Sequence, residues 1–430
     1  MSNLEKIYEL FLAYGSISTD SRKITNGCLF FALKGENFNG NKYAADSLEK
    51  GAAFAVIDEK EYETSERTLL VDNVLTCLQK LAQHHREKLG IPILGITGTN
   101  GKTTTKELIA TVLSKKYEVT FTQGNLNNHI GVPLTLLSMN KETEFGVVEM
   151  GANHPGEIAT LCEIADPDFG IITNIGKAHL EGFGSFEGVI KTKGELYTYL
   201  AEKNGTAFYN QNNPILEKLG KGLSKRISYG TSGADFNGEP VQSPPYIHLK
   251  ANFPKGVLYL NSQLIGDYNF ENILAAACIG NYFGVDPLKI QQAIKDYVPS
   301  NNRSQLIQKD GLTIIMDAYN ANPTSMQASI SSFGTTVKGK RYLILGDMLE
   351  LGEYSPEEHK LILKQVKEKA FENVFLVGKA FSTANQMFHF PEFETVNELC
   401  AFLGKNPIKK GTLLIKGSRG IQLEKVLQYF

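Results

Sequence analysis

The sequence of 430 residues contains no tryptophan and only five cysteines. The cysteines are odd in number, stand far apart and form no Cys-x-x-Cys pair: Cys28, Cys77, Cys162, Cys278 and Cys400. This spacing argues against a disulfide framework and against a cysteine zinc site. Unpaired thiols are typical of a reducing compartment. The cysteine pattern therefore predicts a cytoplasmic protein.

An excess of positive charge and a long apolar run are also missing. Lys plus Arg is 44 and Asp plus Glu is 46, which leaves a net charge of −2. A nucleic-acid binder usually shows a basic excess, so we expect no nucleic-acid partner. No apolar run approaches the roughly 20 residues that span a bilayer. The first ten residues mix acids among apolar side chains, unlike a signal peptide. We expect no membrane insertion.

What the sequence does contain indicates about three domains at this length. Residues 1–88 alternate short strand and helix patterns. Residues 89–298 repeat an apolar strand, a turn and a helix, and residues 299–430 do so again. Strands that are apolar on both faces are typical of a largely parallel, doubly wound sheet. Residues 231–266 interrupt the pattern and predict an antiparallel excursion, and residues 297–302 resemble a linker.

The predicted fold class is therefore α/β with three domains. The central domain, residues 89–298, is predicted to hold a doubly wound, mostly parallel sheet with a phosphate-binding loop. The domain of residues 1–88 is predicted to be a small N-terminal α/β unit. Residues 299–430 are predicted to form a C-terminal, Rossmann-like α/β domain.

The strongest single motif is the glycine-rich segment 95–104, which ends in Lys102-Thr103-Thr104. An apolar strand precedes it and a helix follows, which is the context that a phosphate loop needs. Its backbone N–H groups and the helix start favour phosphate oxygens. Lys102 can reach the β and γ phosphates, and the Thr103 hydroxyl can hold Mg²⁺. The pattern departs from the usual one because Ile96 stands where the first glycine is expected.

Two further residues follow strands of the same domain. Glu149 ends the strand 145–149, beside the crevice where nucleotides bind in such sheets. It is a candidate Mg²⁺ ligand, and a surface or capping acid is the alternative. His179 lies just past the next strand in a glycine-rich segment, which favours a metal or phosphate role. For Lys191, at the start of a predicted helix, we expect a solvent-exposed position and no role in the site.

Polar loops occupy the equivalent position elsewhere in the chain. Segment 124–131 contains Asn125, Asn127 and Asn128 between a strand and a helix. Asn side chains donate and accept hydrogen bonds, which suits sugar hydroxyls and phosphates, although a plain turn remains an alternative. Segments 317–323 and 416–419 have the same placement in the last domain.

Together these motifs resemble the Mur ligases of bacterial cell-wall synthesis, over essentially the whole chain. Within that family they are most similar to the branch that adds D-alanyl-D-alanine. The matching segments are DSR at 20–22, LFFALKG at 29–35, GTNGKTTTKE at 98–107, GNLNNHIGVPLTLL at 124–137, EMGANHPGEI at 149–158, HLEGFGS at 179–185, DAYNANPTSM at 317–326, LGDMLELG at 345–352 and KGSR at 416–419.

The resemblance implies an ATP-dependent, ADP-forming amide ligase. ATP would phosphorylate the terminal carboxylate of UDP-N-acetylmuramoyl-tripeptide, and the amine of D-Ala-D-Ala would attack the acyl phosphate. It also implies two Mg²⁺ ions and a monomer. Residues 1–88 would receive the UDP end of the substrate, residues 89–298 would bind ATP, and residues 299–430 would close on ATP and bind D-Ala-D-Ala.

The resemblance also implies roles for individual residues. It gives catalytic roles to Lys102, His179 and Lys193, and metal contacts to Thr103, Glu149, His179 and Lys193. Lys193 would be carbamylated by CO₂ and would hold the second Mg²⁺ with His179. The ATP contacts would be Gly98, Thr99, Asn100, Gly101, Lys102, Thr103, Thr104, Asn272, Arg303 and Asp317. The substrate contacts would be Asp20, Ser21, Arg22, Asn127, Asn128, Asn320 and Asn322.

Two other functions are compatible with a phosphate loop. A related ligase, such as the diamino-acid-adding Mur enzyme or folylpolyglutamate synthetase, would share the loop but not all the other motifs. A GTPase-type switch would need a guanine-reading NKxD motif, and none is recognisable. The sequence leaves open whether the tripeptide ends in meso-diaminopimelate or lysine.

Overall fold

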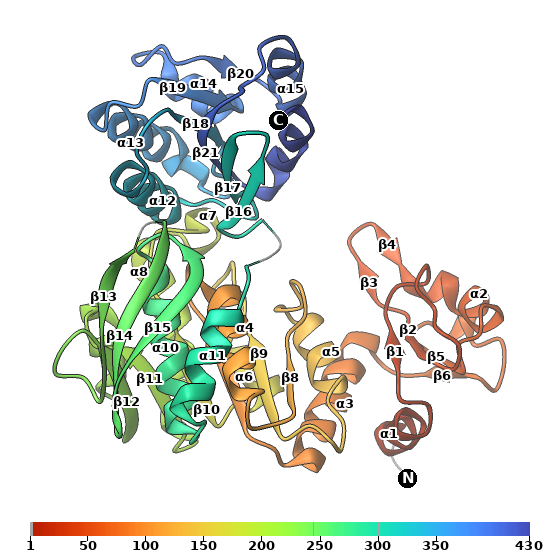
Figure 1. The fold of residues 1–430 in the computed structure, drawn as a ribbon. Helices are drawn as coiled ribbons and strands as arrows, with labels where there is room; N and C mark the ends of the chain where they lie inside the picture. Colours follow the sequence, from red (N-terminus) through yellow and green to blue (C-terminus); the bar gives the residue numbers. More distant parts are fainter. Residues whose placement is uncertain (1–2, 244, 300–301) are drawn as a thin grey trace.

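The computed structural model describes residues 3–243, 245–299 and 302–430, which form three α/β units (Figure 1). The N-terminal unit stands to one side, and the C-terminal unit lies on top of the central one in this view. This arrangement confirms the predicted fold class. The predicted linker, residues 297–302, includes Ser300 and Asn301, which lie outside the described residues, and the predicted boundary at 298/299 stands next to them.

The N-terminal unit is built on a small parallel sheet of four strands in the order β1-β2-β5-β6. A short hairpin of β3 and β4 projects from it (Figure 1). Its elements are α1 (Asn3–Tyr14), β1 (Ile17–Ser18), β2 (Leu29–Phe31), β3 (Lys34–Gly35), β4 (Phe38–Asn39), α2 (Ala44–Glu49), β5 (Phe54–Ile57) and β6 (Thr68–Leu70).

Helix α3 (Val74–Leu89) joins this unit to the next. The Asn73 side chain caps its N-terminus by accepting from Thr76 N, and Gly90 ends it in the left-handed conformation. The helix packs against α1 and β2 on one side and against α5 and α6 on the other. The first two units therefore share one apolar cluster.

The central unit is a sheet of nine strands in the order β15-β14-β13-β12-β11-β10-β7-β9-β8. All neighbours from β8 to β13 pair in parallel, whereas β14 and β15 are antiparallel, as predicted for residues 231–266. The elements are β7 (Ile93–Thr97), α4 (Lys102–Leu113), β8 (Val119–Phe121), α5 (Gly131–Leu137), β9 (Phe145–Glu149), α6 (Glu157–Ala165), β10 (Phe169–Ile172), α7 (Leu180–Phe183), α8 (Phe186–Glu202), β11 (Thr206–Asn210), α9 (Pro214–Gly220), β12 (Lys225–Gly230), β13 (Phe236–Ser243), β14 (Tyr246–Phe253), β15 (Gly256–Ile265), α10 (Asn269–Tyr282) and α11 (Pro287–Asp296).

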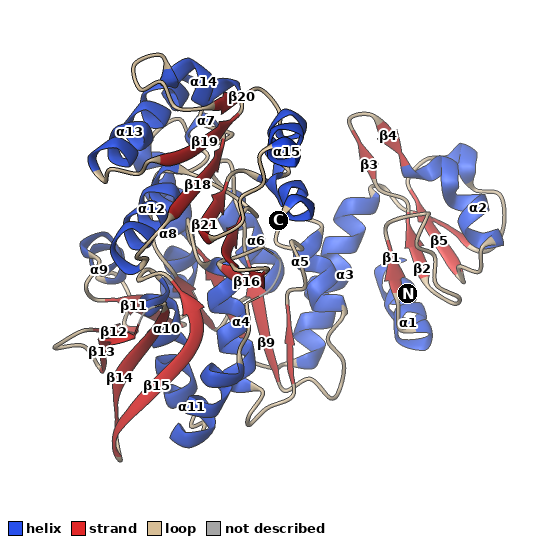
Figure 2. Cartoon of the chain, turned by 45° about the horizontal axis from the view of Figure 1, so that its top comes forward, coloured by secondary structure: helices blue, strands red, loops and turns tan. Residues whose placement is uncertain are grey.

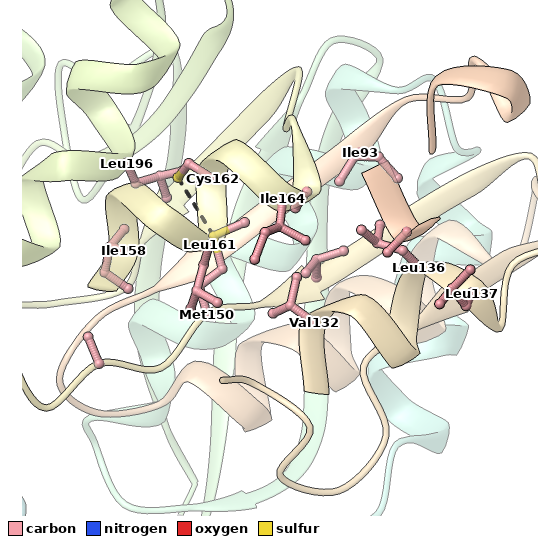
Figure 3. Packing of buried hydrophobic residues seen from close by; sticks show 14 of the residues in the cluster. Ile93, Val132, Leu136, Leu137, Met150, Ile158, Leu161, Cys162, Ile164 and Leu196 are labelled. Carbon is pink, nitrogen blue, oxygen red and sulfur yellow. Dashed lines mark hydrogen bonds between the residues drawn. The ribbon is translucent and has the colours of Figure 1, made fainter. Parts of the chain in front are cut away.

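Alternate residues of the central strands enter apolar clusters on opposite faces. In β7, Ile93 joins the cluster under α5, α6 and α8, and Leu94 joins the one under α4, α10 and α11. Figure 3 shows the first cluster, in which Cys162 Sγ lies 3.8 Å from Met150 Sδ. Each fully buried aliphatic side chain contributes about 1.5–3 kcal/mol. Burial on both faces explains why these strands have no polar alternation.

The C-terminal unit is a sheet of six strands in the order β16-β17-β21-β18-β19-β20. Its neighbours pair in parallel except β16, an antiparallel edge strand that the sequence did not reveal. The elements are β16 (Gln305–Lys309), β17 (Leu312–Asp317), α12 (Pro323–Thr336), β18 (Arg341–Gly346), α13 (Ser355–Glu368), β19 (Asn373–Val377), α14 (Lys379–Asn385), β20 (Glu392–Phe393), α15 (Val396–Lys405) and β21 (Gly411–Lys416).

The C-terminal unit meets the central one at the loops that follow the central strands (Figure 2). Asn322 Nδ2 donates to Asn100 Oδ1 at 2.7 Å, and Lys177 Nζ donates to Glu358 Oε1 at 2.6 Å. These contacts place the start of α12 directly beside the phosphate loop. Among the described residues, no helix is long and apolar enough to cross a membrane.

Candidate functional site

A cavity of about 620 Å³ lies between the central and C-terminal units. The loops after β7, β9 and β10 line one side of it, and the loop after β17, the first half of α12 and the end of β21 line the other. Many residues predicted for the site line it: Thr99, Asn100, Gly101, Lys102, Thr103, Thr104, Asn127, Asn128, Glu149, His179, Asn272, Arg303, Asp317, Asn320 and Asn322. The carboxyl ends of strands from the central sheet and from the C-terminal sheet therefore face each other across this cavity.

The phosphate loop needs glycine at two positions for steric reasons. Gly98 has φ +139°, and a Cβ there would lie 2.1 Å from Thr173 Oγ1. Gly101 caps α4 with φ +75°, and a Cβ there would lie 2.7 Å from Asn272 Oδ1. A side chain at either position would displace the loop from the residues that support it.

The segment after β10 holds the phosphate loop from outside. Asn100 N donates to Asn174 Oδ1 at 2.9 Å, and Thr99 N donates to Asn174 O at 2.9 Å. Asn174 Nδ2 and Thr173 Oγ1 both donate to Asn100 O, at 2.9 and 2.7 Å. Thr99 Oγ1 also accepts from Gly176 N at 3.0 Å. The loop conformation is therefore fixed by the protein itself.

The Lys102 ammonium lies inside the curve of the loop. Its Nζ donates to Gly98 O at 2.7 Å and to Thr99 O at 3.2 Å. Burial lowers the pKa of Lys102, the Glu149 carboxylate opposes that shift, and the Arg303 charge adds to it. The cation is thus already placed where phosphate oxygens would meet it.

Glu149 ends β9 and is only 2% exposed. Its Oε1 accepts from Asn127 Nδ2 at 2.9 Å, and its Oε2 lies 3.6 Å from Lys106 Nζ. That Oε2 is buried and has no hydrogen-bond partner among the described residues. A buried carboxylate oxygen without a hydrogen bond, in a cavity that Thr103 also lines, suits a hard cation such as Mg²⁺.

The structure contains no group of three or more His, Cys, Asp or Glu side chains fit for a metal among the residues it describes. Mg²⁺ is usually held by one or two carboxylates, and water and substrate phosphates complete its coordination. A pair such as Thr103 and Glu149 beside a phosphate loop is compatible with that chemistry.

Lys193 lies on α8, is only 2% exposed and does not line the cavity. Its Nζ donates to Ala152 O at 3.3 Å and lies 5.4 Å from the centroid of the Phe183 ring. Burial holds the pKa of Lys193 well below its usual range, and the Lys102 charge adds to that shift. The neutral amine is therefore accessible at a much lower pH than for an exposed lysine.

His179 follows β10 and contacts the C-terminal unit. Its Nδ1 lies against Oε2 of Glu350, in the loop between β18 and α13. The contact with His179 holds the pKa of Glu350 below its usual range. The His179 side chain remains 22% exposed and lines the cavity.

The C-terminal unit contributes stacked and paired charges to the cavity. The Arg303 guanidinium lies 3.6 Å from the centroid of the Tyr319 ring. Asp317 Oδ2 accepts from Lys416 Nζ at 2.7 Å and from Ser329 Oγ at 3.1 Å. A cation and a carboxylate are therefore presented opposite the phosphate loop.

Several predicted contacts are occupied by the protein or lie elsewhere. Asn272 Oδ1 accepts from Thr105 Oγ1, and Asn128 Oδ1 accepts from two backbone amides at the start of α5. Asp20, Ser21 and Arg22 do not line the cavity. Arg22 instead pairs with Asp20 at 2.9 Å on the surface of the N-terminal unit.

Sequence reasoning missed Lys106, Asn174 and Glu350. Lys106 lies inside α4, and nothing in the local pattern indicates that it faces Glu149. Asn174 and Glu350 follow strands, and that position was the available signal. Both stand in segments that we used for the resemblance or for the crevice edge, without a role of their own.

Comparison with known proteins covers most of the chain. Three family models match it: "Mur ligase family, catalytic domain" at residues 13–86, "Mur ligase middle domain" at 96–280 and "Mur ligase, glutamate ligase domain" at 302–419. The UDP-N-acetylmuramoyl-tripeptide–D-alanyl-D-alanine ligase of Bacillus subtilis is 36% identical, over 98% of this chain and 94% of the relative.

Two solved structures share the fold over nearly full length. MurF from Acinetobacter baumannii has a TM-score of 0.88 at 30% identity and covers 98% of this chain and 97% of its own. MurF ligase from Thermotoga maritima, solved in complex with ADP, has a TM-score of 0.86 at 29% identity and covers 100% of this chain and 98% of its own.

Proposed function

The chain belongs to the Mur ligase family, and on that premise we propose that it joins D-alanyl-D-alanine to UDP-N-acetylmuramoyl-tripeptide in peptidoglycan precursor synthesis. It is an ATP-dependent, ADP-forming amide ligase. The observation that carries the proposal is the shared cavity, because it places a phosphate loop of the central unit opposite Arg303 and Asp317 of the C-terminal unit. The ligase must bring ATP and both substrates together, and a cavity lined by both units provides one place for all three.

The chain's own residues supply charge and orientation for phosphoryl transfer. The Lys102 ammonium and the backbone amides at the start of α4 would bind the transferring phosphoryl group, and Arg303 would approach it from the other side. Catalysis of this transfer consists mainly of positioning and charge stabilisation. The amine of D-Ala-D-Ala would then attack the acyl phosphate, and phosphate would leave as the amide forms.

We assign the first Mg²⁺ to Thr103 and Glu149, and the second to His179 and Lys193. The Oε2 of Glu149, which is buried without a hydrogen bond, supports the first assignment. When bound, Mg²⁺ supplies positive charge to the phosphate oxygens of ATP and to the transferring group.

We also assign a carbamate to Lys193. A neutral lysine amine attacks CO₂, a C–N bond forms, and one proton leaves to give an anion with two carboxylate-like oxygens. The low pKa of Lys193 supports this step because only the neutral amine reacts. Lys193→Ala is expected to lose most activity, and wild-type activity is expected to fall in CO₂-depleted buffer and return with bicarbonate. Turnover indifferent to bicarbonate would contradict the carbamate.

The N-terminal unit, with Asp20, Ser21 and Arg22, would receive the UDP end of the substrate. We propose a monomer in which the C-terminal unit closes further on ATP and the tripeptide, and residues such as Asn127, Asn320 and Asn322 contact the substrate within the cavity. Small-angle scattering should show compaction with saturating nucleotide and UDP-substrate. An unchanged radius of gyration during proven turnover would contradict this closure.

The decisive test is the product. The protein is mixed with ATP, D-Ala-D-Ala and either the diaminopimelate or the lysine form of UDP-tripeptide, and the product is analysed by mass spectrometry. The expected product is the UDP-pentapeptide, formed with equal amounts of ADP and phosphate. Phosphate release only with a diamino acid or with a folate and glutamate would favour the alternative ligases.

A further inference from the structure

His179 and Glu350 meet across the boundary between the central and C-terminal units, and both have an unusual backbone. His179 has φ +50° and Glu350 has φ +61°, the left-handed region that non-glycine residues rarely occupy. Such conformations are strained and persist where the surroundings impose them. Two of them occur at one ion-pair contact, between loops that belong to different units.

The loop that carries Glu350 is held firmly from within the C-terminal unit. Met348 N donates to His359 Nε2 at 3.0 Å, and Leu349 N donates to Ser418 Oγ at 3.0 Å. The Asp347 carboxylate accepts from the first amides of α14, Ala380 N at 2.9 Å and Phe381 N at 2.8 Å. Glu350 is therefore presented by a fixed loop and not by a mobile tip.

The same loop is seated against the segment after His179. A Cβ at Gly352, where φ is +53°, would lie 3.2 Å from Glu181 Cβ, and Tyr354 OH donates to Gly184 O at 3.4 Å. Two further contacts connect the same two units: Lys177 N donates to Thr324 Oγ1 at 3.0 Å, and Lys177 Nζ pairs with Glu358. Docking of the C-terminal unit thus brings Glu350 to His179.

We propose that Glu350 is a positioning residue, carried by the C-terminal unit, which fixes the ring orientation and tautomer of His179 as a ligand of the second metal ion. The inference rests on the proposed function, because it takes the metal role of His179 from there. The second metal site would then be complete only when the C-terminal unit is docked.

The surroundings of the two ring nitrogens of His179 support separate roles for them, one toward Glu350 and one toward the metal ion. Nδ1 lies against the Glu350 carboxylate at ion-pair distance without hydrogen-bond geometry, and Nε2 has no hydrogen-bond partner within the part of the chain that the structure describes. The ring also lines the cavity that holds the phosphate loop. A histidine that binds a metal through one nitrogen commonly donates its other N–H to a carboxylate, and loss of that partner lowers metal affinity.

Lys177 provides a matched control for the interface. Its pair with Glu358 crosses the same boundary, and the lysine side chain is 49% exposed whereas the glutamate side chain is 6% exposed. Lys177→Ala leaves that buried carboxylate without its cation, so it weakens docking while the Glu350 contact stays in place. Glu350→Ala removes the contact, and Glu350→Gln keeps an oxygen that can accept from Nδ1.

The experiment measures Mn²⁺ binding to the full chain in the presence of ADP, by the electron paramagnetic resonance signal of free Mn²⁺. We expect Glu350→Ala to weaken Mn²⁺ binding ~10- to 100-fold, Glu350→Gln to weaken it less, and Lys177→Ala to weaken it less than Glu350→Ala does. Nitrogen NMR of ¹⁵N-histidine protein should show one tautomer of His179 in the wild type and a mixture in Glu350→Ala.

Unchanged Mn²⁺ affinity in both Glu350 variants would overturn the inference. Equal losses in Glu350→Ala and Lys177→Ala would also overturn it, because docking alone would then explain the effect. If Glu350→Ala failed to fold, the isosteric Glu350→Gln would decide by the same measurement. Wild-type ligation of D-Ala-D-Ala is assayed in parallel, and its absence would refute the proposed function itself.

Discussion

The buried pair of Lys416 and Asp317 makes the C-terminal unit sensitive to one substitution. The lysine side chain is 2% exposed and the aspartate side chain 15% exposed, with 2.7 Å between Nζ and Oδ2. Lys416→Met removes the cation and leaves a largely buried carboxylate, a change that costs 3–5 kcal/mol when nothing compensates. Ser329 Oγ and Ser304 N still donate to Asp317, so we expect a loss of about 2–3 kcal/mol.

The loss should appear as a lower melting temperature of one unit. For an unfolding unit of about 130 residues, unfolding entropy of about 2.1 cal/mol/K per residue converts 2.5 kcal/mol into a Tm decrease of roughly 9 °C. Differential scanning calorimetry without nucleotide measures it. Lys409→Met, at an exposed lysine of the same unit, is the control and should shift Tm by less than about 2 °C.

A double substitution tests the cause. In Lys416→Met with Asp317→Asn both charges are gone, so most of the lost stability should return. If Lys416→Met melted like the control, the pair would contribute nothing and the reasoning would be refuted. If the double variant were as unstable as Lys416→Met, lost packing and not the unpaired charge would explain the effect.

Three further predictions concern the loop and a buried histidine. Lys102→Ala should lower turnover roughly a hundredfold or more with an unchanged circular dichroism spectrum, because only two bonds to loop carbonyls are lost. Gly98→Ala should abolish ADP binding in calorimetry, whereas Gly124→Ala, with φ +55° and no atom within 4 Å of its Cβ, should retain it. Burial lowers the pKa of His359 in the folded protein, although the charges of Asp347 and Glu358 oppose that shift. His359 should therefore contribute stability that is present above pH 6.5 and decreases as the pH falls below that value. A His359→Gln variant whose free energy of unfolding in urea titrations had the same pH slope would contradict this.

Local patterns sufficed for most of the fold. The strands of β7, β9 and β10 are buried on both faces, so their apolar runs predicted a parallel sheet, and the glycines around Lys102 predicted the loop. The antiparallel β16 was missed because its residues carry no such run.

Contacts between distant segments could not be predicted. The approach of Lys106 to Glu149, and of Glu350 to His179, depends on how helices and units pack. The three polar residues at 20–22 matched a motif, but their distance from the cavity depends on where α3 places the N-terminal unit.

The support that residues 173–176 give to the phosphate loop has a kinetic consequence. The amides of Thr99 and Asn100 are already held by Asn174, so the loop does not have to fold around an arriving nucleotide. Nucleotide binding then needs no slow conformational change of the loop, and the observed binding rate rises linearly with nucleotide concentration. If the observed rate instead reached a plateau at high nucleotide concentration, the slow step would be a movement of the C-terminal unit, because the loop already has its final conformation.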